Sequence, residues 1–429
     1  MTRSGTIAAV ATAPGKAGVA VVRVSGPDSA AIASALAGKE FSGPGISLCR
    51  LHDGGGTFLD EALVLFFKAP RSYTGEDVVE FQCHGGAVTP RRVLEACFAA
   101  GARLARRGEF TERAFLNGKL SYDQAESVLD LIEAKTARSA DAALEGLVGR
   151  KAKERRELYE SALSLSAEIE HSLDVDEGEL PDDFFSSLSA RTENLRRRLS
   201  GAVRRASEGR ILREGALVVL AGPPNVGKSS LMNALLESDR SIVSDVPGTT
   251  RDSIEEWLDI GGWPVRLVDT AGLRDTADAI EAEGVRRAGE LIDGADVVLR
   301  LYDGGEAPKS GEREIAVRTK CDLPGLTGAG EGVRVSAKSG YGLEELKRLL
   351  AERIAASAEE KELSLPAAPD ALVAALAMIP PPEAFGPGAD AVLIGNSMRL
   401  LSETLGRLAG ASYGKDLLEN LFSRFCVGK

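Results

Sequence analysis

A short glycine-containing stretch in the middle of the chain carries the residue types that bind nucleotide phosphates. Residues 222–230 read Gly-Pro-Pro-Asn-Val-Gly-Lys-Ser-Ser, after an apolar run at 217–220 and before a helix-forming segment at 231–236. The pattern G-x-x-x-x-G-K-[ST] needs this strand, loop and helix order, because loop N–H groups and the helix N-terminus surround phosphate oxygens. We expect Lys228 to reach the outer phosphates and Ser229 to ligate Mg²⁺. An ordinary turn is the alternative for the pattern taken alone.

Two later loops can complete the phosphate and metal site. Residues 247–252 read Pro-Gly-Thr-Thr-Arg-Asp, and Thr250 is placed to join the Mg²⁺ shell when a γ-phosphate is present. The strand-like run 265–268 ends in Asp-Thr-Ala-Gly. Asp269 can therefore hold Mg²⁺ through water, and the N–H of Gly272 can approach the γ-phosphate.

A fourth and a fifth loop predict that the base is guanine. Residues 319–322, Thr-Lys-Cys-Asp, resemble the base reader Asn-Lys-x-Asp, and residues 336–338, Ser-Ala-Lys, are typical of the loop that backs the base. The Asp322 carboxylate can accept two hydrogen bonds from guanine N–H groups, whereas adenine offers an unprotonated ring nitrogen there. Thr319 lacks the reach of a carboxamide. The order and spacing of all five pieces predict a GTPase.

The group that positions the attacking water is not evident from these motifs. Leu273 stands where Ras-like enzymes have a water-orienting glutamine. We hypothesise that a carboxylate from residues 274–281 acts instead, through water. No arginine finger is evident, because a surface salt bridge is the favoured role of each candidate: Arg251, Arg274, Arg286 and Arg287.

The totals bound the class of protein. The chain has 429 residues, so two or three domains are expected, and a net charge of −12 means that any RNA contact is local or shared with a partner. Five cysteines without a C-x-x-C pair predict neither a zinc site nor a disulfide framework, which fits a reducing cytosol. The N-terminus does not resemble a signal peptide, and no apolar run approaches the ~18 residues of a membrane helix.

Changes in periodicity along the chain predict a multidomain fold. Strand-like runs with intervening helices indicate an α+β domain over 1–118. Helical spacing over 119–213 and 364–429 indicates a discontinuous all-α domain, whose two parts are expected to pack together. Between them, 214–358 reads as an inserted α/β P-loop GTPase domain. Expected strands of the first domain are 7–10, 19–24, 63–67 and 78–81, and its expected helices are 28–36 and 90–100.

Longer segments of the chain resemble one family. The segments are Ala-Val-Val-Arg-Val-Ser-Gly at 20–26, Tyr-Thr-Gly-Glu to His-Gly-Gly at 73–86, Arg-Gly-Glu-Phe to Lys-Leu at 107–120, and Phe-Cys-Val-Gly-Lys at 425–429. With the motifs at 222–230 and 247–252, they make the chain similar to the TrmE/MnmE family of tRNA modification GTPases over essentially its whole length.

The resemblance implies a homodimer in the cytoplasm that works on tRNA with a flavoprotein, glucose-inhibited division protein A, as a heterotetramer. The partner carries FAD, and a tetrahydrofolate derivative supplies the one-carbon unit for an aminomethyl-type group on carbon 5 of the wobble uridine. The family's folate-binding residues match Arg23, Glu80, Lys119 and Lys429. A carboxylate suits the pterin N–H edge and cations suit the glutamate tail. From the residues alone, the favoured interpretation of Glu80 is a solvated strand carboxylate, and a side chain pointing into a pocket is the alternative.

The resemblance also implies K⁺ in place of an arginine finger and activation by pairing of two G domains. The K⁺ ligands match Asn225, Ser244, Val246 and Thr249, although Asn225 is alternatively a plain turn residue. The water-positioning glutamate matches Glu281. The expected GTP contacts are Asn225, Val226, Gly227, Lys228, Ser229, Ser230, Ser244, Asp245, Val246, Pro247, Gly248, Thr249, Thr250, Asp269, Thr270, Ala271, Gly272, Thr319, Lys320, Asp322, Ser336, Ala337 and Lys338.

Two other functions were weighed against this one. A ribosome-assembly GTPase of the Era kind needs an RNA-binding domain after the G domain, whereas this chain continues with acidic-to-neutral helical sequence and ends in Cys-Val-Gly-Lys. The N-terminal domain is alternatively a free-standing folate enzyme with a regulatory GTPase. Cys426 either reacts or shapes the folate pocket, and we favour the second role.

Overall fold

A computed structural model shows that the chain forms two compact units. It describes residues 5–174, 180–238, 255–269, 281–304, 306–309, 311–323, 332–360, 370–386, 388–409 and 421–429. The first unit comprises residues 1–129, 146–149 and 410–429, and the second comprises 130–145 and 150–409. Each is described by itself.

The first unit is built on a six-stranded sheet with the order β3-β4-β5-β2-β1-β6. Its strands are β1 (Ile7–Val10), β2 (Val19–Ser25), β3 (Gly45–His52), β4 (Phe58–Phe67), β5 (Val78–His84) and β6 (Arg103–Leu104). Neighbours are antiparallel except β1 and β6. The four expected strands are confirmed; β3 and β6 were not expected from the sequence.

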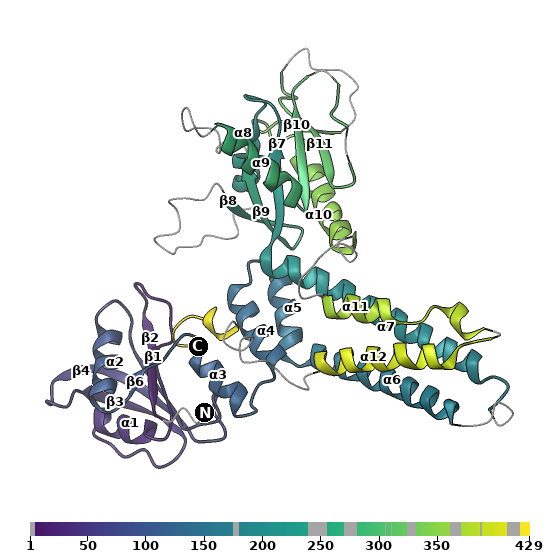
Figure 1. Ribbon diagram of the computed structural model, residues 1–429. Helices are drawn as coiled ribbons and strands as arrows, with labels where there is room; N and C mark the ends of the chain where they lie inside the picture. The colour runs from purple at the N-terminus through teal and green to yellow at the C-terminus, as the bar shows by residue number, and fades with distance from the viewer. Residues whose placement is uncertain are drawn as a thin grey trace. The chain divides into compact units, whose positions relative to one another are not determined.

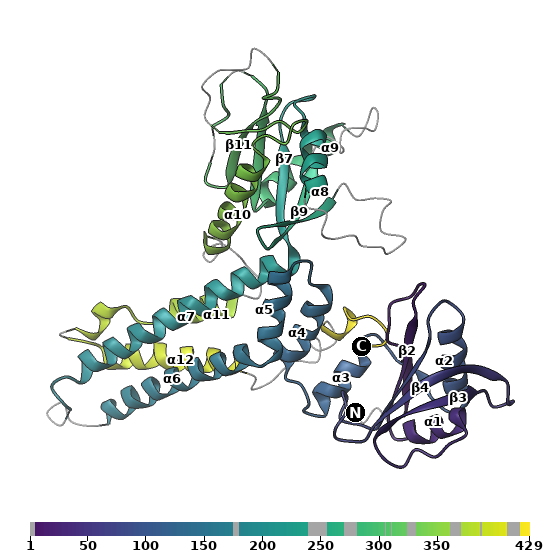
Figure 2. The same ribbon diagram turned by 180° about the vertical axis from the view of Figure 1, so that it is seen from behind.

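Helices cover both faces of this sheet (Figures 1 and 2). On one face, α1 (Ser29–Ala37) and α2 (Thr89–Ala99) bury Ile32 and Val93 against the strands. On the other face, α3 (Glu109–Leu116) buries Phe110 against β1. The apolar spacing of all three helices therefore serves one α+β core.

The end of the chain packs in this first unit. Leu421, Phe422 and Phe425 are buried against Ala125 and Leu129 at the start of α4 (Tyr122–Glu133). Burial against α4 removes these three large apolar side chains from water and places them in the first compact unit, while the expected bounds of the helical domain, 119–213 and 364–429, stay a prediction.

The second unit contains a helical bundle. Its helices are α5 (Ala137–Leu147), α6 (Arg150–Leu173), α7 (Phe184–Glu214), α11 (Asp370–Met378) and α12 (Ala391–Leu408), with a short 3₁₀ turn, η3 (Pro382–Phe385). α6 and α12 lie side by side (Figure 1), where Leu165 of α6 and Met398 of α12 belong to one buried cluster. The expected packing of the two helical parts is therefore confirmed.

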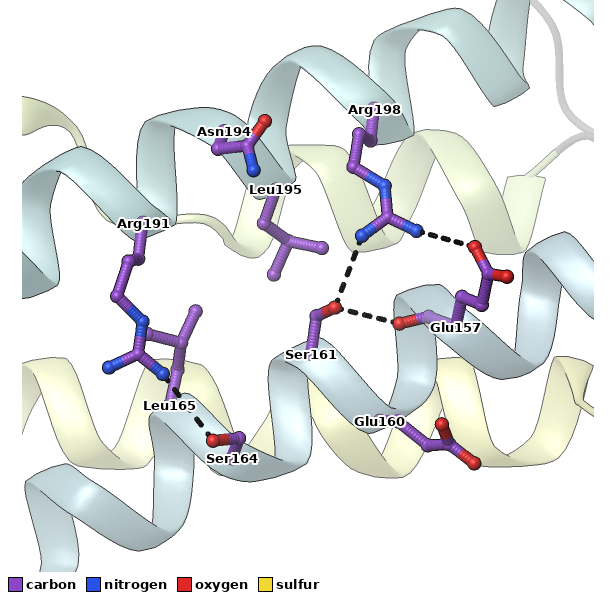
Figure 3. A pocket seen from close by; sticks show the side chains of 9 residues that line it. All are labelled: Glu157, Glu160, Ser161, Ser164, Leu165, Arg191, Asn194, Leu195 and Arg198. Atoms are coloured by element: carbon purple, nitrogen blue, oxygen red, sulfur yellow. Dashed lines mark hydrogen bonds and ion pairs between the residues drawn. The ribbon is translucent and has the colours of Figure 1, made fainter.

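Many charges on the bundle pair with one another. In the groove between α6 and α7, Arg198 reaches Glu157 at 3.1 Å (Figure 3). Arg191 of α7 also pairs with Glu168 of α6. The guanidinium of Arg196 donates to the carbonyl oxygen of Ile379 at 2.9 Å. These contacts pair charged side chains of the bundle with other groups of the bundle, at its surface.

The second unit also contains a six-stranded, mostly parallel sheet with the order β12-β11-β10-β7-β9-β8. Its elements are β7 (Ala216–Ala221), β8 (Glu255–Ile260), β9 (Trp263–Asp269), β10 (Val297–Tyr302), β11 (Glu314–Arg318), β12 (Val333–Arg334), α8 (Lys228–Ser238), α9 (Glu281–Gly294) and α10 (Leu343–Glu360). Among the described strands of this sheet, β8 pairs antiparallel with β9, and the other neighbouring strands are parallel. The predicted multidomain fold class is thereby confirmed.

Two further observations complete the fold. In the second unit, the guanidinium of Arg138 lies 3.7 Å from the ring centroid of Trp263, and Thr136 donates to the carbonyl oxygen of Gly262 at 2.8 Å, so the start of α5 holds the β8–β9 turn.

Among the described helices, none combines the length and apolarity needed to cross a membrane.

A buried carboxylate, Glu109, ties α3 to its surroundings in the first unit. It is 1% exposed, accepts hydrogen bonds from Arg103 Nη1 and the Arg106 N–H, both at 2.9 Å, and pairs with Arg113. Burial acts to raise the pKa of Glu109, but the hydrogen bonds and charges of these arginines outweigh it and hold the pKa at about 2. Arg113 continues the network to Glu76 at 2.9 Å.

Replacement of this carboxylate should cost stability in a pH-dependent way. Because the pKa of Glu109 is lower folded than unfolded, its contribution is fully present above about pH 4.5 and is lost as the pH falls toward 2. We expect Glu109→Gln to lower the free energy of unfolding of this unit by about 3 kcal/mol at pH 7 and by roughly 1 kcal/mol less at pH 3.5. Hydrogen exchange of α3 peptides measures both values. A pH-independent difference would contradict this account.

Candidate functional site

The carboxyl edge of the second sheet gathers the expected nucleotide loops. β7 lies between β9 and β10, and residues 222–227 connect β7 to α8, which begins at Lys228. A Cβ at Gly222 would stand 2.6 Å from the carbonyl oxygen of Leu301, so only glycine allows the loop to pass so close to β10. Asn225 adopts φ +59°, a left-handed conformation that asparagine tolerates.

The phosphate-binding lysine is held over this loop. Lys228 is 6% exposed, and its Nζ donates to the carbonyl oxygens of Gly222 and Pro223 at 3.0 and 2.9 Å. The amino group thus already faces the concave side of the loop. It is positioned to exchange these carbonyl contacts for phosphate oxygens, which bind an ammonium more strongly.

A pair of oxygen ligands stands beside the lysine. Register pairs Leu220 of β7 with Asp269 of β9, and the Ser229 hydroxyl donates to Asp269 Oδ2 at 2.8 Å. Hydroxyl and carboxylate oxygens with phosphate are the ligands that Mg²⁺ prefers. Ser229 of α8 and Asp269 of β9, which the sequence assigned to Mg²⁺, are therefore brought together.

The base-reading residues lie at the ends of β11 and β12. The Ser336 hydroxyl donates to Asp322 Oδ1 at 2.8 Å, and this bond lowers the pKa of Asp322, keeping the exposed carboxylate ionised. Lys320, at φ +57°, places its Nζ 2.7 Å from Asp303 Oδ2 at the end of β10. The loop is thus braced from two neighbouring strands.

Several expected contacts lie outside the described residues. They are Ser244, Asp245, Val246, Pro247, Gly248, Thr249, Thr250, Thr270, Ala271 and Gly272. Glu281 is the first residue of α9, and its side chain is not described. The roles assigned to these residues stay predictions.

The first unit contains a second cluster of charged residues, at the face covered by α3. Arg23 of β2 and Glu80 of β5 are direct cross-strand neighbours, and Arg23 Nε lies 2.7 Å from Glu80 Oε1. Both side chains are less than one-fifth exposed. The guanidinium lies over the rings of Tyr73 and Phe110, at 5.4 and 5.7 Å from their centroids. The cluster offers one carboxylate and one cation between aromatic faces.

The last residue of the chain joins this cluster. Burial first, and then the charge of Arg23, lowers the pKa of Lys429, while the charge of Glu80 raises it. The carbonyl oxygen of Lys429 accepts from the Phe110 N–H at 3.2 Å, and Val427 forms a β-bridge with Arg107. Main-chain contacts to α3 therefore carry Lys429 to a site whose other members lie hundreds of residues earlier.

Lys119 and Cys426 have looser relations to the cluster. Lys119 is exposed, donates to the carbonyl oxygen of Pro70 at 3.1 Å and packs its stem near Gly75, in the loop that also supplies Tyr73. Cys426 has an exposed, free thiol, and its main-chain carbonyl oxygen accepts a hydrogen bond from the Gly108 N–H. No described contact joins either side chain to Arg23 or Glu80.

Sequence reasoning missed the aromatic members of this cluster and its support. Tyr73 and Phe110 lie inside segments that the sequence analysis singled out, but the sequence offered no reason to assign them a role. The same is true of Glu109 and Arg113, the buried ion pair of α3. The sequence signal for this network was the presence of Glu109, Glu112 and Arg113 within five residues of one short helix. Whether such charges are buried is decided by packing against distant strands.

Comparison with known proteins was made for the whole chain. The family model described as GTP-binding protein TrmE N-terminus matches residues 6–119, and the model described as MnmE helical domain matches residues 123–426. The chain is 41% identical to the tRNA modification GTPase MnmE of Azoarcus sp. (strain BH72), over 99% of this chain and 98% of the relative. It is 43% identical to the protein of the same name from Alkalilimnicola ehrlichii, over 99% of both chains.

Exchange of the base-reading carboxylate should switch nucleotide preference. We expect Asp322→Asn to weaken GTP binding by roughly 100-fold, because charged hydrogen bonds to the guanine N–H groups are lost, and to improve binding of xanthosine triphosphate, whose C2 carbonyl can accept from the new amide. Glu344→Gln on α10, whose side chain is 88% exposed, is the matched control. Calorimetric titration with both nucleotides measures the change, and an unaltered preference would contradict the assignment.

Proposed function

Because the chain belongs to the MnmE family of tRNA modification GTPases, we propose that it uses GTP hydrolysis to drive installation of an aminomethyl-type (carboxymethylaminomethyl) group at C5 of the wobble uridine of certain tRNAs. It acts in the cytoplasm with a flavoprotein of the glucose-inhibited division protein A kind, as a heterotetramer in which the partner carries FAD. One observation carries the proposal: the chain combines the loops expected to bind a guanine nucleotide with a second cluster, of charged and aromatic side chains, around Arg23 and Glu80.

The GTPase site acts through positioning and electrostatics. Loop amides and Lys228 would hold the phosphates. Ser229 and Thr250 would ligate Mg²⁺ and Asp269 would hold it through water, and the metal would supply positive charge to offset the charge that develops between the phosphates. Glu281, at the start of α9, orients the attacking water. Asn225, Ser244, Val246 and Thr249 provide the K⁺ ligands.

The pocket of the first unit suits a reduced folate. Glu80 can accept from the amino and ring N–H groups of a pterin, and the rings of Tyr73 and Phe110 supply apolar walls. Lys429 and Lys119 offer cations for the glutamate tail. The lowered pKa of Lys429 reflects its half-buried place beside Arg23, which suits a residue that gains a carboxylate partner on binding.

A homodimer is supported by an apolar surface on the first unit. Register places Ile46 opposite Leu65 and Leu48 opposite Leu63, so that these side chains share one face of β3 and β4. Ile46, Leu48 and Leu63 are 69%, 66% and 42% exposed. A second copy of the chain is the occupant we propose, because β3 is an edge strand of the described sheet and its apolar face remains open.

The charge of the chain bears on how tRNA is held. The net charge is −12, and Arg191, Arg198 and Arg205 of the bundle are each paired to a glutamate, so these three arginines are partly neutralised within the chain. We infer that tRNA contacts are shared with the flavoprotein partner.

Potassium should accelerate hydrolysis. We expect the GTP turnover rate at equal ionic strength to be roughly tenfold or more higher in KCl than in NaCl, and to rise with protein concentration as copies pair. Asn225→Gly removes the proposed ligand while tolerating the positive φ, and should lower the rate in KCl to the rate in NaCl. Asn233→Ala, exposed on α8, is the control. Equal wild-type rates in both salts would rule out the potassium role.

Loss of either strand residue should weaken folate binding. We expect Arg23→Ala and Glu80→Ala each to reduce the affinity for 5-formyltetrahydrofolate by about tenfold to 100-fold, because each removes a charged contact and leaves its partner unpaired. Arg50→Ala, on the exposed part of the same sheet, is the matched control. Calorimetry of the full chain measures the affinities, and unchanged values for both variants would remove this site.

A further inference from the structure

The hydroxyl proton of Thr319 is already used inside the protein. Thr319 is 4% exposed, and its Oγ1 lies 2.6 Å from the carbonyl oxygen of Val226 and 3.3 Å from that of Tyr302. A hydroxyl has one proton to donate, and both neighbours are carbonyl oxygens, which only accept. The Thr319 side chain therefore has no hydrogen left for an acceptor atom of a ligand.

Thr319 stands between the two ends of the nucleotide site. Its hydroxyl reaches the phosphate loop at Val226, and a Cβ built at Gly227 would lie 3.9 Å from the Thr319 Cβ. Asp322, three residues later, is held by Ser336. A nucleotide with its phosphates on the loop and its base at Asp322 must therefore pass Thr319.

The two edges of guanine need opposite partners. The N1 and N2 groups donate hydrogen bonds, which a carboxylate such as Asp322 can accept, whereas N7 and O6 accept hydrogen bonds. A donor at position 319 would be needed to read N7 from this loop. An amide side chain has two N–H groups and could serve both Val226 and the base, whereas the single hydroxyl proton of threonine is committed to Val226.

We propose that Thr319 is a positioning residue that ties the phosphate loop to the base-reading loop, and that this chain leaves guanine N7 without a hydrogen bond. The inference rests on the proposed guanine-nucleotide site. Selectivity for guanine then comes from Asp322 at the opposite edge of the base, and nucleotides altered at N7 bind as well as the natural ones.

The test compares GDP with 7-deaza-GDP, in which N7 is replaced by a C–H group, by calorimetric titration of the full chain. Wild type should bind the two within about twofold of each other. Thr319→Asn should favour GDP by roughly two- to tenfold, because its second N–H reaches N7. Thr319→Val should weaken the binding of GDP and of 7-deaza-GDP by the same factor, since the carbonyl oxygen of Val226 loses its donor. Thr319→Ser, which keeps the hydroxyl, should bind both nucleotides as wild type does.

Two results would overturn the inference. One is wild-type protein that binds 7-deaza-GDP more than fivefold more weakly than GDP, which would mean that N7 is read. The other is folded Thr319→Val, verified by circular dichroism, that binds both nucleotides as wild type does. If the valine variant does not fold, the ratio of the two affinities in wild type and Thr319→Asn still decides the question. Failure of wild type to bind GDP at all would instead count against the guanine site itself.

Discussion

The parallel pairing of β7 with β9 and β10 is the constraint on which the nucleotide site depends. Parallel neighbours end at one edge of a sheet, so the loop after β7, the carboxylate at the end of β9 and the base-reading loop after β11 converge there. The Ser229–Asp269 contact is a direct product of this register. Without the pairing, each motif would remain a loop with the right residues and no common ligand.

Single buried polar contacts then tune what the sheet brings together. Thr319 joins the phosphate loop to the base loop with one hydroxyl proton, and Ser336 keeps the Asp322 carboxylate ionised. Each of these contacts requires only one small hydroxyl side chain. The Thr319 contact sets the spacing between the two ends of a nucleotide, because the buried carbonyl oxygen of Val226 has no water to replace the hydroxyl.

Charge is organised differently in the first unit. Arg23 and Glu80 pair across neighbouring strands, and the arginine network around Glu109 holds α3 and its Phe110 ring above them. The last residue, Lys429, is carried to the same place by main-chain contacts to α3. A site that uses both ends of the chain forms only when the chain is folded, which links its ligand binding to the integrity of the unit.

The sequence by itself determined the local parts of this protein. The strand, loop and helix order, the carboxylate expected to read guanine and the alternation of the four expected strands depend on residues within about one element of each other, where periodicity and turn chemistry act. Tertiary structure alone decided the unexpected β3, the burial of Leu421, Phe422 and Phe425, the aromatic rings around Arg23 and the use of the Thr319 hydroxyl. Thr319 and Val226 are 93 positions apart, and the Arg107–Phe425 contact spans 318. Such contacts follow from which surfaces pack together, and packing depends on the whole core rather than on any local pattern.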